Sequence, residues 1–151
     1  MRVTVQRVSK ASVKVDGEIV GKIDRGLVCM LGIKNTDDDK VIKWMSNKLV
    51  NLRIFNDGDG RKNISVQDIN GGILLISNFT LYGEIRKGSR PNFGNAAGQE
   101  IAEPIYDKML EYLKSEYDIL IQAGKFGAMM EVELINDGPI TLNIEKEAKT
   151  Q

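Results

Sequence analysis

The alternation of hydrophobic and polar positions predicts strands in the first part of the chain. Residues 2–8 alternate with a period of two, as side chains do along a β-strand. Residues 11–15 and 18–23 alternate in the same way on either side of an Asp-Gly pair, which is typical of a two-residue hairpin turn. Residues 26–33 are hydrophobic apart from two glycines, which favours a central strand buried on both faces. The pattern therefore predicts that these segments form the strands before the first helix.

Two segments carry the period of an amphipathic helix. The first begins after Thr36, its predicted N-cap, and we expect the acids at residues 37–39 to cap and charge its first turn rather than to bind a metal. The second spans about residues 100–117, where Pro104 is tolerated because it falls in the first turn. The positions that define the two hydrophobic faces are Val41, Ile42, Met45 and Leu49 in the first helix, and Ile101, Ile105, Met109 and Leu113 in the second.

Further strands are predicted in the second half of the chain, around one long irregular segment. Residues 73–76 form a short hydrophobic run typical of a buried strand, and residues 64–70 and 119–121 are further extended candidates. Residues 83–98 are rich in glycine, arginine, asparagine, serine and proline, and we expect them to form the longest loop. The Asn-Asp-Gly-Asp-Gly run at residues 56–60 lacks the ligand spacing of a calcium loop and predicts a turn.

The last two strands are predicted as a hairpin around residues 136–141, Asn-Asp-Gly-Pro-Ile-Thr. Two alternating runs, residues 130–135 and 140–145, flank this stretch. A proline at the start of the returning strand removes a backbone donor, so it belongs on a sheet edge or in a distorted turn. Gly138-Pro139 is either turn punctuation or a backbone site, because glycine lets another molecule approach its carbonyl closely.

The order β-β-β-α-β-α-β-β-β predicts an α+β fold in a single domain over residues 1–151. Most of the strands are joined by hairpins. We therefore expect a curled, mostly antiparallel, barrel-like β-sheet packed by two helices. The chain starts with a strand pattern rather than a signal peptide, and its hydrophobic runs are shorter than a membrane span. We expect a cytoplasmic protein with no membrane partner.

Composition restricts the chemistry. The chain has no histidine, which removes the usual general base, the Ser-His and Cys-His nucleophile pairs and nearly every zinc site. We expect neither a metal nor another cofactor. The 21 basic and 21 acidic residues give zero net charge, so any contact with nucleic acid must be local. Cys29, the single cysteine, lies in a hydrophobic run and is expected to be a buried, inert thiol in a reducing compartment.

Two stretches carry side chains suited to binding or catalysis. Residues 77–81, Ser-Asn-Phe-Thr-Leu, directly follow a predicted buried strand that would hold them rigidly. Their hydroxyl groups either bind neighbouring backbone or act in a site, but no histidine is present to activate them. In the long loop, Arg86, Lys87 and Arg90 are interleaved with glycine, proline and an aromatic residue. This loop either grips phosphates beside a stacked base or is simply a solvated basic loop.

Residues 77–81, residues 88–93 (Gly-Ser-Arg-Pro-Asn-Phe) and residues 136–141, in this order, closely resemble the D-aminoacyl-tRNA deacylase family, also called the D-tyrosyl-tRNA deacylase family. These enzymes check chirality in translation. The opening residues 1–8 and the Asp-Gly hairpin are similar too, so the resemblance covers essentially the whole chain. One departure is visible: the family usually has glutamine where this chain has Asn78, a shorter amide that could shift a hydrogen bond in the pocket.

The resemblance implies an enzyme that hydrolyses the ester bond of D-aminoacyl-tRNA, with tRNA but not DNA as its nucleic-acid partner. It also implies a homodimer with active sites at the subunit interface. In this family the Gly138-Pro139 bond is cis and enters the pocket of the other subunit, where main-chain carbonyls accept from the substrate's α-amino group. An L-side chain would clash, whereas glycine has no side chain to exclude, so glycyl-tRNA is an expected second substrate.

The resemblance also assigns residues to the site. Arg7 would brace the Gly-Pro segment, and Thr80 is either a nucleophile or a positioning residue. Main-chain donors at residues 79–80 could instead form an oxyanion hole, while the 2′-hydroxyl of the terminal ribose orients water. The remaining assignments are Phe126 and Met130 to the pocket wall, Ser77, Phe79 and Thr80 to the side that meets the ester and terminal adenosine, Gly138, Pro139 and Asn78 to substrate, and Arg86, Lys87 and Arg90 to tRNA.

Two alternatives remain open at this level. The protein could be a non-catalytic RNA-binding module that uses the basic loop at residues 86–93. It could also be a threonine hydrolase that acts on other esters or amides through Thr80.

Overall fold

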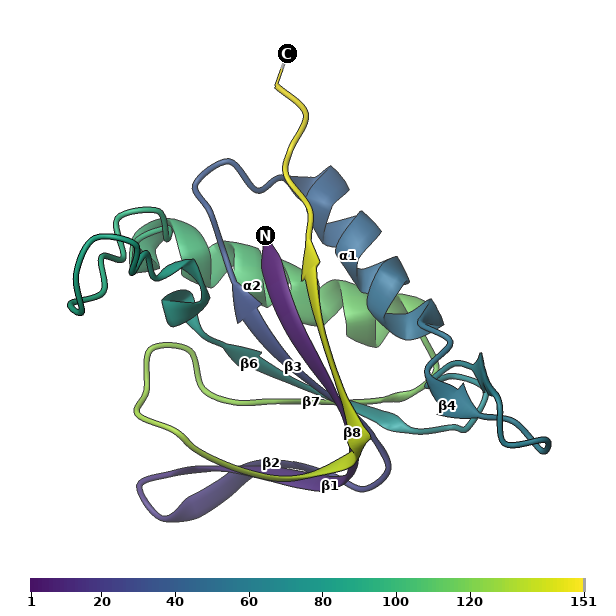
Figure 1. The fold of residues 1–151 in the computed structure, drawn as a ribbon. Helices are drawn as coiled ribbons and strands as arrows, with labels where there is room; N and C mark the ends of the chain where they lie inside the picture. The colour runs from purple at the N-terminus through teal and green to yellow at the C-terminus, as the bar shows by residue number, and fades with distance from the viewer. Residues whose placement is uncertain (151) are drawn as a thin grey trace.

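The computed structural model describes residues 1–150 and has one six-stranded mixed sheet packed by two helices (Figure 1). The elements in chain order are β1 (Arg2–Val15), β2 (Glu18–Ile23), β3 (Gly26–Gly32), α1 (Asp39–Asn51), β4 (Phe55–Asn56), β5 (Lys62–Ile64), β6 (Gly72–Ser77), the 3₁₀ helix η1 (Phe79–Tyr82), α2 (Gln99–Glu116), β7 (Leu120–Ala123) and β8 (Glu131–Glu145). Neither of the two α-helices is long and hydrophobic enough to cross a membrane.

The sheet runs in the order β2-β1-β3-β6-β7, and β8 pairs with β1. β1 is antiparallel to β2, β3 and β8, whereas β6 is parallel to both β3 and β7. The sheet is nearly closed, because β2 lies beside β7 and the Lys22 N–H donates to the side-chain oxygen of Gln122 over 3.2 Å. The predicted α+β fold with a curled, barrel-like sheet and two helices is confirmed.

The central strands are buried on both faces, as their continuous hydrophobic runs predicted. In β3, Leu27 and Cys29 face the core beneath the helices, whereas Val28 faces a second core inside the curled sheet. In β6, Leu75 belongs to the helix-side core and Leu74 to the inner one. Successive side chains of a strand point to opposite faces, so a strand between two cores needs no polar position.

The closing hairpin predicted from the sequence is wrong. β8 is one continuous strand, and both of its halves pair with β1: residues 131–136 with residues 8–14, and residues 141–145 with residues 2–6. The chain therefore does not reverse at residues 137–140, which interrupt the ladder as an irregular insertion. β1 correspondingly runs without a break through both alternating segments, residues 2–8 and 11–15, with register shifts on either side of Val8. A sheet edge or a distorted turn was expected for Pro139, and it lies in the unpaired interruption of β8, a strand that pairs only with β1 within residues 1–150.

Helix α1 begins later than predicted, because the acids before it have separate tasks. The N-cap is Asp38, not Thr36, and its carboxylate accepts from the Val41 N–H over 2.9 Å. Asp37 is buried and binds the Met1 amino group at 2.7 Å rather than capping the helix. The Asp37 N–H donates to the Lys34 carbonyl, and this turn delays the helix start.

Helix α2 also differs from its prediction in detail. It begins at Gln99, so Pro104 is its sixth residue and lies beyond the first turn. The buried face contains Ala102 and Tyr106 together with the predicted Met109 and Leu113, while Ile101 is 44% exposed. The Tyr106 hydroxyl donates to the Leu75 carbonyl over 2.8 Å, which ties the helix to β6. The predicted hydrophobic face omitted Tyr106, because a tyrosine is buried only where its hydroxyl finds a partner, and the sequence does not show that partner.

The small hairpin of β4 and β5 includes the predicted turn at residues 56–60. The Asp57 carboxylate accepts from the main-chain N–H groups of Asp59 and Arg61, at 2.9 and 3.0 Å. The extended piece predicted over residues 64–70 is wrong, because β5 ends at Ile64 and turns follow. The Asp68 carboxylate accepts from the Ser65 N–H and so closes the first of these turns.

Candidate active site

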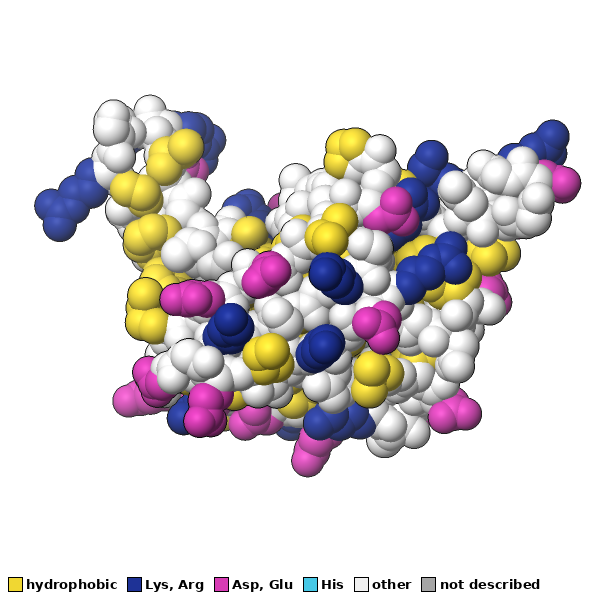
Figure 2. All heavy atoms as spheres, turned by 90° about the horizontal axis from the view of Figure 1, so that it is seen from below, with side chains coloured by type: hydrophobic (Ala, Val, Ile, Leu, Met, Phe, Trp, Pro, Cys, Tyr) yellow, Lys and Arg dark blue, Asp and Glu magenta, His cyan; other side chains and the backbone are white. Residues whose placement is uncertain are grey.

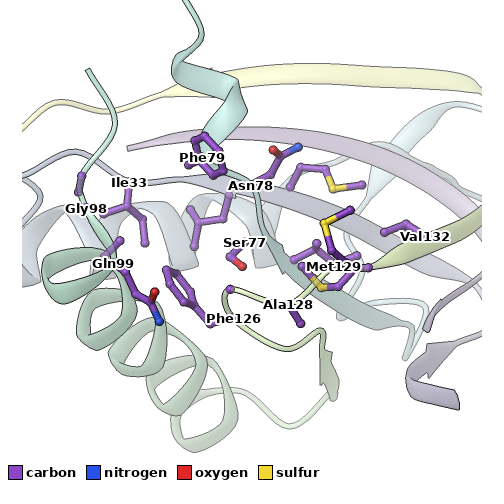
Figure 3. A pocket seen from close by; sticks show the side chains of 17 residues that line it. Ile33, Ser77, Asn78, Phe79, Gly98, Gln99, Phe126, Ala128, Met129 and Val132 are labelled. Carbon is purple, nitrogen blue, oxygen red and sulfur yellow. The ribbon is translucent and has the colours of Figure 1, made fainter. Parts of the chain in front are cut away.

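A cavity of about 660 Å³ opens where the parallel strands β3 and β6 end (Figure 3). Its walls come from the ends of these strands, the start of α2 and the loop of residues 124–130. This volume lies within the usual range of small-molecule sites, roughly 300–1,000 Å³. The lining is mostly hydrophobic, with Phe126 and Met129 on the loop side and the polar groups of Ser77, Asn78 and Gln99 around them.

The cavity contains no ionisable side chain. None of the described residues that line it is acidic, basic or histidine, so its polar groups are hydroxyl, amide and main-chain groups. Cys29, the single cysteine, is fully buried in the core, and burial raises the pKa of its thiol to about 12. The site therefore has no general base of its own. It is suited to chemistry in which positioned neutral donors act on an already reactive bond.

Ser77 is held rigidly, because it is the last residue of β6. It pairs with Leu31 of β3, and the next residue, Asn78, donates its N–H to the Leu31 carbonyl over 2.8 Å. The Ser77 hydroxyl points into the cavity in Figure 3. This placement agrees with the expectation that polar side chains at the end of a core strand are well positioned for a site.

The 3₁₀ helix η1 forms one rim of the cavity. Asn78 is its N-cap, and its side-chain oxygen accepts from both the N–H and the hydroxyl of Thr80. Phe79 is 57% exposed and packs edge-to-face on Phe93 of the long loop, with 5.1 Å between the ring centres. The Phe79 N–H donates to no other group within residues 1–150. As the first amide of a helix it has no partner within the helix.

The Gly-Pro segment lies apart from this cavity in the same chain, since neither Gly138 nor Pro139 lines it. The Gly138-Pro139 peptide bond is cis, as the resemblance implied, and Gly138 has a positive φ of 130°. Arg7, only 6% exposed, contacts both the carbonyl and the carboxylate of Asp137 at 3.2 Å. The Asn136 side-chain amide donates to the Arg7 and Ile140 carbonyls, at 3.0 and 2.9 Å. Arg7 and Asn136 thus hold the segment at both ends.

The basic loop forms a third group, beside an open groove of about 860 Å³. Arg86 is paired with Glu84 at 2.6 Å, and hydrogen bonds from Arg86 lower the pKa of that carboxyl to about 2. Lys87 and Arg90 form no ion pair within residues 1–150. Figure 2 shows basic side chains at the tip of the lobe that this loop makes, at the left of Figures 1 and 2. The central face in Figure 2 instead mixes acidic and basic groups.

The sequence-predicted residues therefore separate into four places. Ser77, Asn78, Phe79, Phe126 and Met130 line the cavity. Thr80 lies beyond its rim, on the turn that follows Asn78. Gly138 and Pro139, with Arg7 bound beside them, lie outside the cavity lining. Arg86, Lys87 and Arg90 line the loop groove.

Sequence reasoning missed Gln99 and Met129 among the cavity residues. The position of Gln99 at a helix start directly after the long loop was a usable signal. Met129 had none, because an exposed methionine in a loop has no distinctive pattern.

These features define a single-domain α+β protein with a neutral cavity at the carboxyl ends of two parallel strands and a basic loop beside it. The chain belongs to the D-Tyr-tRNA(Tyr) deacylase family, whose sequence model matches residues 4–145. The resemblance seen in the sequence motifs is thus confirmed.

Related proteins match over almost their full length. A protein of Geobacillus sp. (strain WCH70) named D-aminoacyl-tRNA deacylase is 52% identical over 99% of this chain and 97% of its own. One of the same name from Brevibacillus brevis is 51% identical over 96% and 99%. A solved structure described as the c-Myc DNA Unwinding Element Binding Protein superposes with a TM-score of 0.93 at 43% identity, covering 98% of this chain and all of that one. A probable eukaryotic D-amino acid tRNA deacylase, 16% identical with a TM-score of 0.78, shares the fold over 95% and 98%.

Proposed function

We propose that this protein hydrolyses the ester bond of D-aminoacyl-tRNA to free D-amino acid and tRNA, and that it rejects L-aminoacyl-tRNA. The observation that carries the proposal is the match over nearly the whole chain to relatives named D-aminoacyl-tRNA deacylase, at about half identity. The cavity supports it chemically, because an aminoacyl ester is reactive enough to be cleaved by positioned neutral groups. Since its substrate is made where proteins are translated, we place the enzyme in the cytoplasm.

In the proposed reaction, a water oxygen bonds to the ester carbonyl carbon and the bond from that carbon to the ribose oxygen breaks. The ribose oxygen leaves with a proton, and the released carboxylic acid loses its proton to solvent. The Phe79 N–H would stabilise the oxyanion, since it has no partner within residues 1–150 and belongs to a residue that lines the cavity. The 2′-hydroxyl of the terminal ribose would orient the water, because the cavity lining has no side-chain base.

Selection against L-substrates is proposed to come from Gly138-Pro139 of a second subunit. The position of this segment outside its own chain's cavity supports a role in trans, and a homodimer with twofold symmetry would insert each segment into the opposite site. Fixed carbonyls would accept from the substrate's α-amino group only when its side chain points away. An L-side chain would then meet the wall, whereas glycine would pass, so glycyl-tRNA is a proposed second substrate.

The rival assignments receive less support. A threonine hydrolase needs a group that takes the proton of Thr80, but this hydroxyl faces an amide oxygen of Asn78. A non-catalytic RNA-binding module would use the basic loop, but this assignment gives the neutral cavity no function.

The direct test compares D-tyrosyl-tRNA, L-tyrosyl-tRNA and glycyl-tRNA as substrates at equal concentration. We expect release of D-tyrosine and glycine, and a rate for the L-ester within about tenfold of the buffer rate, because discrimination by steric exclusion and lost polar contacts reaches several orders of magnitude. Acid-precipitable counts from labelled amino acid measure all three. Binding of D-tyrosyl-tRNA without hydrolysis would support the RNA-binding module instead.

The basic loop gives a second prediction. Replacing Lys87 and Arg90 together by alanine should raise KM for D-tyrosyl-tRNA with little change in kcat, because the loop would hold phosphates away from the ester. The slope of log KM against the logarithm of the salt concentration should decrease by about one for each lost phosphate contact. Arg86→Ala should have a smaller effect, since Arg86 is already paired with Glu84.

Lys62→Ala is the matched control for the loop variants. Lys62 is an exposed cation on the β4–β5 hairpin, at the opposite end of the molecule in Figure 1. Equal KM values for this control and the loop double variant would show that the loop does not bind tRNA. Competition by duplex DNA as strong as that by uncharged tRNA would contradict the proposed preference for tRNA.

A further inference from the structure

The side chain of Asn78 is fully oriented by Thr80. Its side-chain oxygen accepts from the Thr80 main-chain N–H over 3.2 Å and also from the Thr80 hydroxyl. A main-chain N–H can only donate, so the atom that faces it must be the amide oxygen and not the amide nitrogen. The Asn78 nitrogen therefore points away from Thr80, at the rim of the cavity that Asn78 lines.

This arrangement divides the donors of the turn into two groups. Both donors of Thr80 are occupied by Asn78, so neither is available to an incoming ester. The Phe79 N–H, one residue earlier, has no partner within residues 1–150 and belongs to a residue that lines the cavity. The turn itself is anchored to the sheet by the Asn78 N–H, which donates to the Leu31 carbonyl over 2.8 Å.

The ring formed by Asn78 and Thr80 depends on side-chain length. An asparagine oxygen reaches the N–H two residues ahead, which is the geometry of an N-cap. Alanine lacks the acceptor, whereas serine retains a short one. The arrangement is therefore open to a test by substitution at either partner.

We propose that Asn78 is a positioning residue of the deacylation site, which holds both donors of Thr80 and so fixes the turn that presents the Phe79 N–H to the ester carbonyl. This inference rests on the proposed function. Thr80 acts through Asn78, and its hydroxyl proton is directed at an amide oxygen that is too weak a base to generate a nucleophile. Of the two main-chain donors considered for an oxyanion hole, only that of Phe79 remains.

A double-mutant cycle tests the coupling of the two residues. Single-turnover hydrolysis of D-tyrosyl-tRNA is measured for the wild type, Asn78→Ala, Thr80→Val and the double variant, with enzyme in excess. Asn78→Ala removes both contacts with Thr80 and should slow the chemical step by about tenfold, whereas Thr80→Val removes only the hydroxyl contact and should slow it less. The double variant should be no slower than Asn78→Ala, because the effects of residues in contact are not additive. The enzyme concentration that gives half the maximal rate should change by less than about twofold, since the turn acts on the chemical step rather than on binding.

Conservative variants distinguish positioning from a general loss of structure. Thr80→Ser retains both donors and Asn78→Ser retains an acceptor, so each should recover a rate within about threefold of the wild type. Independent effects that multiply in the double variant would overturn the proposal. Thr80→Val without any activity, beside a normal Asn78→Ala, would instead establish Thr80 as the nucleophile. Melting temperatures within a few degrees of the wild type confirm that all variants fold.

Amide hydrogen exchange provides a readout that does not depend on activity. The Thr80 amide should exchange slowly in the wild type and at least about tenfold faster in Asn78→Ala, because the substitution removes its acceptor. The Phe79 amide should exchange fast in both. An unprotected Thr80 amide in the wild type overturns the proposal whatever the activity. If the Thr80 amide of the wild type is protected but the enzyme does not hydrolyse D-tyrosyl-tRNA, the turn geometry is supported. The proposed function and the catalytic role of Asn78 are then both wrong.

Discussion

Gly138→Ala should slow the hydrolysis of D-tyrosyl-tRNA by at least about 100-fold, because a displacement of about 1 Å in a positioning group has an effect of this size. A Cβ atom at this position would lie 2.9 Å from both the main-chain nitrogen and Cγ1 of Ile140. The φ of 130° is also one that residues with L-side chains rarely adopt. The segment would have to shift, and its carbonyls would move out of the proposed position for the substrate's α-amino group.

The measurement is the single-turnover rate with D-tyrosyl-tRNA and with L-tyrosyl-tRNA, together with the melting temperature. Gly17→Ala is the matched control: Gly17 also has a positive φ, of 80°, but a Cβ there meets nothing within 4 Å. Its hairpin turn lies outside the cavity lining, so we expect backbone strain without loss of activity. Unchanged kinetics in Gly138→Ala would argue against a backbone filter. Equal losses in both variants would reduce the effect to general destabilisation.

A mixed dimer of two inactive variants should regain about half of the wild-type rate per dimer, since one of its two symmetry-related sites would be complete. One protomer carries Gly138→Ala, and its partner carries Ser77→Phe. The Ser77 hydroxyl points into the cavity, so a phenyl ring in its place would fill the space that the ester needs. Only if the Gly-Pro segment acts in trans does the mixed dimer join an intact cavity to an intact segment.

Co-expression with two different affinity tags isolates the mixed dimer, and both parent homodimers serve as inactive controls. If the segment served the cavity of its own chain, the mixed dimer would be as inactive as its parents, because each protomer would carry one defect in its single site. A chain that sediments as a monomer at assay concentration would also contradict the proposed arrangement. Recovery well below half would point to exchange of protomers into the inactive parent homodimers, which a mass measurement after the assay detects.

Much of the fold was accessible from the sequence, because short-range patterns reflect burial. The hydrophobic run of β3 and the helical stripe of α1 reported burial directly, and both elements were predicted within a few residues. The site was accessible mainly through the motifs at residues 77–81 and 136–141. Their local patterns alone did not distinguish a site from a turn, since Gly, Pro, Ser and Asn are common in both.

The errors share a physical cause. A hairpin and a bulged continuous strand have the same alternation on both sides of a glycine-proline break, and only the partner strand distinguishes them. Here β1 is long enough to pair with both halves of β8, so the break at residues 137–140 is an insertion in one ladder. Similarly, Asp37 was expected to cap a helix, but tertiary contacts bring the Met1 amino group to it. Pairing between distant residues overrides local preference in both cases.

The sequence by itself determined the number and order of most elements, the family and the exclusion of histidine chemistry, because these follow from composition, periodicity and motif order. Only the tertiary structure decided which candidates share a cavity: Ser77, Asn78 and Phe79 meet Phe126 and Met130, while Gly138 lies elsewhere in the chain. It also decided that the lining is uncharged and that Asn78 occupies both donors of Thr80. Such properties depend on the distances and directions of side chains from separate elements, and those are fixed only when the sheet curls and the helices pack.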